Sequence, residues 1–486
     1  MSLSRDLFWE KYDLESRSNV IYQFARYALR LNYESLPKEV IHEAKRSLLD
    51  TLGVAIGAYN SGASRRPVLE AAARELGGPE EATLFGSGLR TSALNASLVN
   101  SYLVRFQDYN DVGTGSHIRG GHGNHSSDAT ASILAVSERE KAGGRDFITS
   151  SVISYELGFR AGTAGPVRPG TKEPPRPQSQ ASLLDARASL CMPPALGKLM
   201  GLNEDQIANA TGICASHSFA LGVIMREGPN MNKNIRFGFT AHDAILCCIL
   251  AKNGFLGAVR VFESEAGLTG LSRVINTGLE TDPQRIVDFS GWRILDTRYK
   301  FYRGCAGLHG QIQATLDIVR ENDIKPEDIE AVHIKNSTMA IFKDRLPFKY
   351  PRFAEAADHS GHYSAAIAIK ERTLGPESYE PEKFSDPVVL DLIDKITIEP
   401  DPDVPAEGGI SEITTKDGRR FEKRVDNPHG FYDDPLTDKE LEDKFREMAI
   451  KCMDDKQIQS IFDIVWNLEN LDDINKLTAL MVWKPK

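Results

Sequence analysis

The amino-acid sequence predicts a mainly α-helical protein with an inserted α+β domain. Apolar residues recur at helical spacing through most of the first 274 residues, whereas residues 275–428 contain short alternating segments typical of strands. Helical spacing returns near the C-terminus. We therefore expect residues 1–274 and 429–486 to build one helical domain, with residues 275–428 forming a smaller α+β lid domain.

The composition of the 486-residue chain is that of a soluble globular protein, with 41% hydrophobic and 26% charged residues. The net charge of −10 and the lack of clustered Lys/Arg argue against a nucleic-acid surface. The sequence shows neither a signal-peptide pattern nor an apolar run of 18 residues, so neither export nor a membrane span is expected. Its six cysteines lack CxxC or zinc-like spacing, which favours the reducing cytoplasm and no metal cage.

The elements of the helical domain follow from their apolar faces. One helix begins near Ser18, and a second follows Pro37, which the first turn of a helix tolerates. Residues 63–90 contain a short helix and a strand-like segment at 82–85. Longer helices are expected over residues 91–106, 147–160, 183–202, 204–222 and 237–253, with a proline-rich loop over 165–180.

The inserted domain is predicted because the spacing of apolar residues changes from the helical repeat to the alternation typical of strands. Residues 292–300 and 329–336 look extended on either side of a helix at 308–321, which predicts a βαβ-like unit. Residues 358–373 are expected to form one helix. A further helix at 388–393, a strand at 395–399 and a hairpin within 411–425, with its turn at Asp417-Gly418, complete the domain.

A glycine-rich loop between two apolar helices carries several chemically active side chains. Asp108 and Asp111 end the first helix, the loop contains Arg119 and His122, and the second helix begins at His125. The Ser and Asp residues that follow are expected to supply N-cap oxygens, leaving backbone N–H groups that attract carboxylates. The alternative for this stretch alone is a purely structural connection.

Five polar clusters lie in or beside otherwise apolar segments. Singly, each is more often structural than catalytic, because lysines usually cover a surface and tyrosines often pack. Their occurrence together favours a catalytic site. The clusters are Asp108/Asp111, His125 with Asp128, Lys233 with Arg236, Lys300-Phe-Tyr-Arg-Gly-Cys305, and Asp358-His-Ser-Gly-His362-Tyr363.

Together these motifs resemble the MmgE/PrpD family, which includes 2-methylcitrate dehydratase, cis-aconitate decarboxylase and iminodisuccinate epimerase. The resemblance runs almost end to end. It also includes segments 44–53 and 197–202, Lys233 five residues before Gly238, and Phe384-Ser-Asp386. It implies a helical domain plus an α+β lid with the active site between them, a homodimer, and no metal or other cofactor.

The resemblance also implies the site residues. The family's catalytic positions match Asp108, His125, Lys233, Lys300 and Tyr363. The resemblance also places Cys305 in the pocket, at a position that differs among members. From the residue types alone, and not from the resemblance, we expect substrate-binding roles for Arg119, His122, Arg303 and Asp111 as well as for Cys305.

These residue types suit proton transfer next to a carboxylate. Removing such a proton makes a dianionic, enolate-like species, which a cation at Lys233, Lys300, Arg303 or Arg119 could stabilise. His125 could be the base, because an imidazole titrates near neutral pH. Tyr363 could donate or shuttle a proton.

Two departures from the family pattern argue against 2-methylcitrate itself as the substrate. Val112 stands where many members have a catalytic threonine, and no histidine occurs between His125 and His217. We expect a cofactor-independent lyase or dehydratase of a small hydroxy di- or tricarboxylate. The alternatives are a decarboxylase or epimerase of a related polycarboxylate, or a catalytically silent binding member; iron–sulfur chemistry lacks clustered cysteine ligands.

Overall fold

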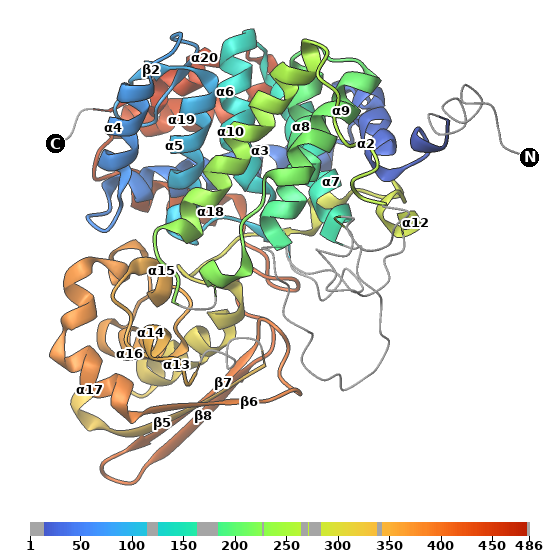
Figure 1. Ribbon diagram of the computed structural model, residues 1–486. Coiled ribbons are helices and arrows are strands. Elements are labelled where there is room, and N and C mark those ends of the chain that lie inside the picture. Colours follow the sequence, from blue (N-terminus) through green and yellow to red (C-terminus); the bar gives the residue numbers. More distant parts are fainter. Residues whose placement is uncertain are drawn as a thin grey trace, which may run out of the picture.

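The computed structural model describes residues 14–113, 125–162, 183–225, 228–263, 271, 283–337 and 343–483. Figure 1 shows a large helical part and, below it, a smaller part that combines helices with a sheet. This arrangement confirms the predicted mainly α fold with an inserted α+β domain. The predicted boundary at residue 275 falls within 272–282, outside the described residues, and stays a prediction.

The helical part is built from both halves of the described chain. Its helices up to residue 286 are α2 (Val20–Arg30), α3 (Lys38–Asn60), α4 (Arg66–Leu76), α5 (Ala93–Phe106), α6 (Thr130–Glu140), α7 (Gly144–Gly162), α8 (Leu183–Leu199), α9 (Glu204–His217), α10 (Asn232–Lys252) and α12 (Pro283–Ile286). Near the C-terminus they are joined by α18 (Asp438–Ala449), α19 (Asp455–Trp466) and α20 (Asn475–Thr478). Two short strands, β1 (Ala82–Thr83) and β2 (Arg90–Thr91), pair antiparallel beside them.

Helices α5 and α10 pack closely at the centre of this part (Figure 1). Gly238 permits the approach, because a Cβ atom there would lie 2.5 Å from the carbonyl oxygen of Leu98. Most side chains of both helices are buried, as the apolar sequence of α5 predicts. The close packing brings Lys233, in the first turn of α10, to the C-terminal end of α5.

The C-terminal helix α18 packs on α3. A Cβ atom at Gly53 would lie 3.1 Å from the side chains of Phe445 and Met448, so glycine leaves room for them. Lys444 lies one turn before Met448 on α18. Its ammonium group donates to Asp50 Oδ1 at 2.7 Å and to the carbonyl oxygens of Tyr109 and Lys300 at 2.8 and 2.9 Å. Lys444 therefore ties α18 to the junction of the two parts.

The smaller part contains a four-stranded sheet with the order β6-β5-β7-β8. β5 (Ile329–Asn336) pairs parallel with β6 (Ile396–Pro400) and antiparallel with β7 (Gly409–Thr415), which pairs with β8 (Arg420–Val425). The predicted hairpin at 411–425 is therefore confirmed. The helices of the smaller part are α13 (His309–Glu321), α14 (Leu346–Lys349), α15 (Ala354–Ala357), α16 (Gly361–Glu371) and α17 (Pro387–Lys395).

The predicted βαβ unit is wrong. Residues 293–296 form a 3₁₀ turn, and β4 (Thr297–Arg298) pairs antiparallel with β3 (Val112–Gly113), not with β5. The parallel crossover instead joins β5 to β6. The short helix predicted over 358–373 is confirmed as α16, with narrower bounds. α15 ends before it at Ala357, and α16 begins at Gly361, where the Ser360 hydroxyl caps it by accepting from the Tyr363 N–H.

No helix in the described part of the chain combines the length and apolar character needed to cross a membrane.

Candidate active site

A buried ion cluster lies where the two parts meet. The Lys233 ammonium donates to both carboxylate oxygens of Asp358 at 2.8 and 2.7 Å and to Asp108 Oδ2 at 3.1 Å. Lys233 comes from α10, Asp108 follows α5, and Asp358 follows α15 in the smaller part. The cluster therefore joins residues that are 125 positions apart and that come from both parts of the molecule.

Two further cations complete the cluster around Asp108. The Lys300 ammonium donates to Asp108 Oδ1 at 2.6 Å and to its carbonyl oxygen at 2.7 Å, and Arg105 lies 3.3 Å from the same carboxylate. Asp108 adopts a left-handed backbone conformation with φ of 46°, which turns both oxygens toward Lys300. Strands β3 and β4 meet beside this point.

Three cationic side chains, Lys233, Lys300 and Arg105, thus surround the two carboxylates Asp108 and Asp358. Burial alone would raise the pKa of Asp108, but the charges of Lys233 and Lys300 outweigh it and hold the pKa well below its usual range. The excess of positive charge suits an anionic ligand. Both lysines are fully buried, so in this conformation they act on a ligand through their electric field.

His359 extends the cluster toward Cys305. Its Nδ1 atom lies 2.5 Å from Asp358 Oδ1 and 3.6 Å from Asp108 Oδ2. The Cys305 backbone N–H donates to the Asp358 carbonyl oxygen at 2.8 Å. His359 and Asp358 belong to a cluster that the sequence singles out, yet the sequence-based choice took only Tyr363 from that segment.

His125 lies beside the ion cluster, and its hydrogen bond and surroundings determine its protonation state. Its Nδ1 atom lies 2.8 Å from the carbonyl oxygen of Asp111, which can only accept, so Nδ1 carries the proton and Nε2 can accept another. Burial and the charges of Arg105 and Lys300 lower the pKa of His125 well below its usual range. His125 is therefore neutral at pH 7, as a base must be.

The expected N-cap at His125-Ser-Ser-Asp128 is wrong. Residues Ser126–Ala129 form a 3₁₀ turn before α6, and neither helix has a side-chain cap hydrogen bond. The Ser127 hydroxyl instead accepts from the Asn110 amide at 2.9 Å. Burial raises the pKa of Asp128 to about 7.

Asp111 lies in the helical part beside Tyr155, whose hydroxyl donates to Asp111 Oδ2. Burial raises the pKa of Asp111 to about 7, so near neutral pH a fraction of this carboxyl group holds its proton. Asp111 is thus placed next to His125 through its carbonyl group, but its side chain points to Tyr155.

Tyr363 and Arg303 lie outside the ion cluster. The Tyr363 hydroxyl donates to the Ser378 carbonyl oxygen at 2.7 Å, and its ring packs against Tyr379 and Phe384. Arg303 is fully buried and donates to the carbonyl oxygens of Gln107 and Pro376 at 3.2 and 2.6 Å. Arg303 therefore joins the two parts in this conformation, whereas these contacts of Tyr363 lie within the smaller part. Arg119 and His122 lie outside the described residues.

Sequence reasoning also missed two buried residues at the junction, Lys444 and His309. Burial and the charge of Lys300 lower the pKa of His309 to about 3, which makes it neutral. A lysine or histidine within an ordinary amphipathic helix carries no signal of this placement. Only the three-dimensional packing of α13 and α18 against the junction reveals it.

The donor atoms of Asp108, Asp358 and His359 lie within 4.8 Å of one another, a spacing that a metal ion could use. The ammonium groups of Lys233 and Lys300 already contact these carboxylate oxygens and would repel a cation. Within the described residues this group therefore has the character of an ion-pair network.

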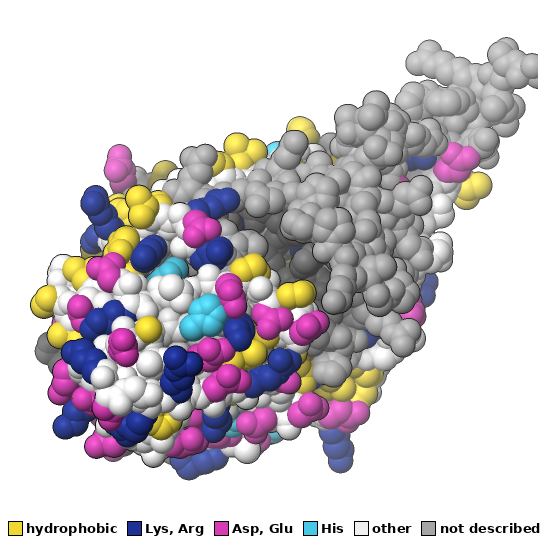
Figure 2. All heavy atoms as spheres, turned by 90° about the horizontal axis from the view of Figure 1, so that it is seen from below, with side chains coloured by type: hydrophobic (Ala, Val, Ile, Leu, Met, Phe, Trp, Pro, Cys, Tyr) yellow, Lys and Arg dark blue, Asp and Glu magenta, His cyan; other side chains and the backbone are white. Residues whose placement is uncertain are grey.

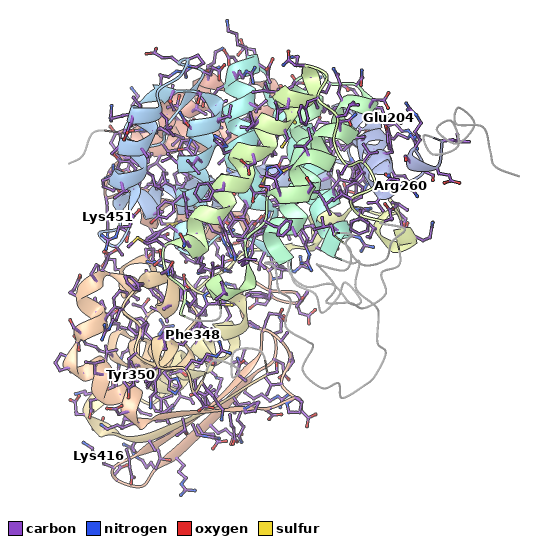
Figure 3. The ribbon with its side chains drawn as sticks, viewed as in Figure 1. Glu204, Arg260, Phe348, Tyr350, Lys416 and Lys451 are labelled. Atoms are coloured by element: carbon purple, nitrogen blue, oxygen red, sulfur yellow. The ribbon has the colours of Figure 1, made fainter. Side chains whose placement is uncertain are left out.

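A small pocket of about 60 Å³, open to solvent, lies on another side of the junction. It is lined by Gly57, Gln107, Glu447 and Lys451, with Glu377 and Glu380 at its rim. Lys451 marks this edge of the helical part in Figure 3. Three glutamates against one lysine make the pocket a poor site for a carboxylate ligand.

The described face of the smaller part that Figure 2 shows has Lys and Arg interspersed with Asp and Glu. No extended surface of one sign is visible on this part of the molecule.

Comparison with known proteins places the chain in a family. Residues 22–278 match the MmgE/PrpD N-terminal domain and residues 302–470 the MmgE/PrpD C-terminal domain. The cis-aconitate decarboxylase-like protein oryM of Aspergillus oryzae is 25% identical over 96% of this chain and 98% of its own length. Cis-aconitate decarboxylase of Aspergillus terreus is 24% identical, covering 96% and 97%, and alkylcitrate dehydratase phiI of a fungal species is 25% identical, covering 89% and 88%. With both domain models matched in order across the junction that holds the ion cluster, the chain belongs to the MmgE/PrpD family.

Proposed function

We propose that this protein is a lyase acting on a small polycarboxylate, with decarboxylation of a cis-aconitate-like tricarboxylate as its reaction. The observation that carries the proposal is the buried cluster of Lys233, Lys300 and Arg105 around two carboxylates, next to a neutral histidine and a thiol. The relatives named for cis-aconitate decarboxylation support it by covering nearly the whole chain.

The chemistry requires a place for negative charge. When a carboxylate leaves as CO₂, its bonding electrons stay on the neighbouring carbon and spread into the remaining carboxylates. The field of the two buried lysines stabilises this charge, and a proton donor at the cluster then completes a C–H bond. Both lysines are residues that the sequence analysis selected. The donor that it selected, Tyr363, has its hydroxyl group bonded to the Ser378 carbonyl oxygen.

Dehydration of a hydroxy acid is the second candidate, and the alkylcitrate dehydratase relative favours it. The same cluster would then stabilise the charge formed when a base removes a proton next to a carboxylate. Neutral His125 supplies that base, with Nε2 as the accepting atom.

The deciding experiment incubates the purified protein, with a chelator present, with cis-aconitate, citrate, 2-methylcitrate and related di- and tricarboxylates in D₂O. NMR distinguishes CO₂ loss, alkene formation and simple hydrogen exchange. His125→Ala is the variant at the site, and His217→Ala, at an exposed histidine, is the matched control. If no acid reacts or exchanges, the lyase proposal is refuted and a binding role takes its place.

The same proposal includes a cytoplasmic homodimer. Sedimentation equilibrium at micromolar concentration tests the dimer, and a monomer there would refute it without affecting the catalytic proposal.

A further inference from the structure

Cys305 is the place where the ion cluster approaches solvent. Four charged side chains of the cluster are at most 2% exposed, namely Lys233, Lys300, Asp108 and Asp358. Cys305, in contrast, is partly exposed. The other five cysteines are buried. Cys305 is therefore more exposed than the four charged residues that it adjoins.

His359 is held in the orientation that a thiol partner requires. Its Nδ1 atom is engaged by Asp358 Oδ1 at 2.5 Å, which leaves Nε2 for the sulfur. Lys233 in turn binds both oxygens of Asp358, which fixes the carboxylate. The backbone bond from Cys305 to the Asp358 carbonyl oxygen sets the thiol next to this histidine.

The thiol also precedes a helix. Cys305 is the residue before a 3₁₀ turn at Ala306–Leu308, which continues into the 13 residues of α13. Partial positive charge at a helix N-terminus favours an anion, here a thiolate. A partly exposed cysteine in an electropositive setting is the usual environment of a reactive thiol.

The electrostatics agree with this geometry. Burial opposes ionisation of Cys305, but the charge and hydrogen bond of His359 outweigh it and lower the pKa of the thiol. Burial and the charge of Lys233 oppose protonation of His359, but Cys305 and Asp358 together raise its pKa to about 9. The other charged groups that act on the pair are Asp108, Lys300 and Arg105.

We propose that Cys305, His359 and Asp358 form a thiolate–imidazolium–carboxylate triad at the junction, in which the Cys305 sulfur is the group that exchanges a proton with the substrate. The inference deepens the proposed function and rests on it for the identity of the substrate. Asp358 is a positioning residue, because it acts through His359.

The proton balance of the decarboxylation follows from this assignment. The bond to the departing carboxylate breaks, CO₂ leaves, and the electron pair stays on the substrate carbon. The proton held by His359 passes through the Cys305 sulfur to that carbon, and the triad regains one proton from water. In a dehydration His125 Nε2 would take the proton from carbon and later return it to solvent. The departing hydroxide would take the proton that His359 passes through the Cys305 sulfur, leave as water, and the triad would again regain one proton from water.

The test is the pH dependence of Cys305 alkylation, measured by intact mass after reaction of the full chain with iodoacetamide between pH 5.5 and 9. An ordinary thiol, with a pKa of about 8.5, reacts roughly tenfold faster for each pH unit between 6 and 8. We expect the native protein to take up one label at a rate that rises much less steeply with pH, because the pKa of its thiol is lowered. His359→Gln should restore the steep rise, and Asp358→Asn should shift the midpoint of the profile upward.

Two matched variants identify the labelled sulfur. Cys305→Ser should take up no label under these conditions, whereas Cys452→Ser, at a buried cysteine away from the cluster, should label like the parent protein. Cys305→Ser should also turn over the identified acid at least about 100-fold more slowly, with an unchanged thermal unfolding midpoint.

A steep profile in the parent protein, or one that His359→Gln leaves unchanged, would refute the triad regardless of activity. A shallow profile together with full turnover by Cys305→Ser would refute proton exchange at the sulfur. If the profile is shallow but no polycarboxylate reacts, the proposed function fails while the ion pair stands.

Discussion

Replacing Lys233 with methionine tests whether the ion cluster holds the junction together. The substitution keeps the length of the side chain and removes the one ammonium group that bonds both Asp108 and Asp358, at 3.1, 2.8 and 2.7 Å. Asp108 keeps Lys300 and Asp358 keeps His359, so neither carboxylate loses every partner. Removing one member of a buried ion pair costs about 3–5 kcal/mol, and we expect a loss of unfolding free energy in this range.

The loss is measurable by urea unfolding followed by circular dichroism. With a slope of about 3 kcal/mol per molar urea, the midpoint should fall by about 1–2 M. Lys439→Met is the control, because Lys439 is largely exposed and pairs with Asp443 only at the surface, where a pair contributes at most about 1 kcal/mol. The double variant Lys233→Met/Asp358→Asn should recover part of the stability, since it also removes a buried charge.

A fall of less than about 1 kcal/mol for Lys233→Met, indistinguishable from the Lys439 control, would show that the cluster is open to water. Failure of the double variant to recover any stability would instead locate the loss in packing.

Four other outcomes are expected. His125→Ala should lower turnover of the identified acid by roughly 100-fold with the fold intact, measured by steady-state kinetics; near-normal turnover would leave His125 a packing residue. Asp111→Asn should raise stability at pH 8: a carboxyl group whose pKa is raised to about 7 contributes stability below its unfolded value near 4 and loses it as the pH rises through 7, so urea midpoints of variant and parent should agree at pH 4 and diverge by pH 8. Lys444→Met should cost about 3–5 kcal/mol in the same unfolding assay, because Asp50 and two backbone carbonyl groups lose their donor; an unchanged midpoint would contradict this. Arg119→Ala should mainly raise KM, and Arg119→Lys should restore binding only in part because it cannot form a bidentate pair; equal KM values for all three proteins would place Arg119 away from the substrate.

Much of the helical architecture could be predicted because its signal is local. Helices α3, α5 and α7 are long and carry apolar residues at regular helical spacing, so this spacing alone locates them. The βαβ unit failed because β4 has only two residues and pairs with β3, which lies 184 or more positions earlier. A strand of two residues is too short to show an alternation of apolar and polar residues. Its pairing partner depends on the packing of the whole chain.

The site residues also divide into those that a local sequence signal can select and those that only long-range packing reveals. Asp108, Lys233 and Lys300 could be selected because charged residues inside apolar segments are unusual, and the structure brings these three together. The role of His359 depends on contacts with Asp358 and Cys305 that no spacing rule contains. Tyr363 was selected by motif, but its hydroxyl group is taken by the Ser378 carbonyl oxygen.

The position of Lys444 has a consequence for the order in which the molecule assembles during synthesis. Asp50, Tyr109 and Lys300 all leave the ribosome well before α18, whose ammonium group bonds each of them. Until that helix docks, the buried Asp50 carboxylate lacks its counterion, and the segments that carry Asp108 and Lys300 lack a shared anchor. A nascent chain can therefore form its early helices, but the junction closes only when one of the last helices to be made arrives.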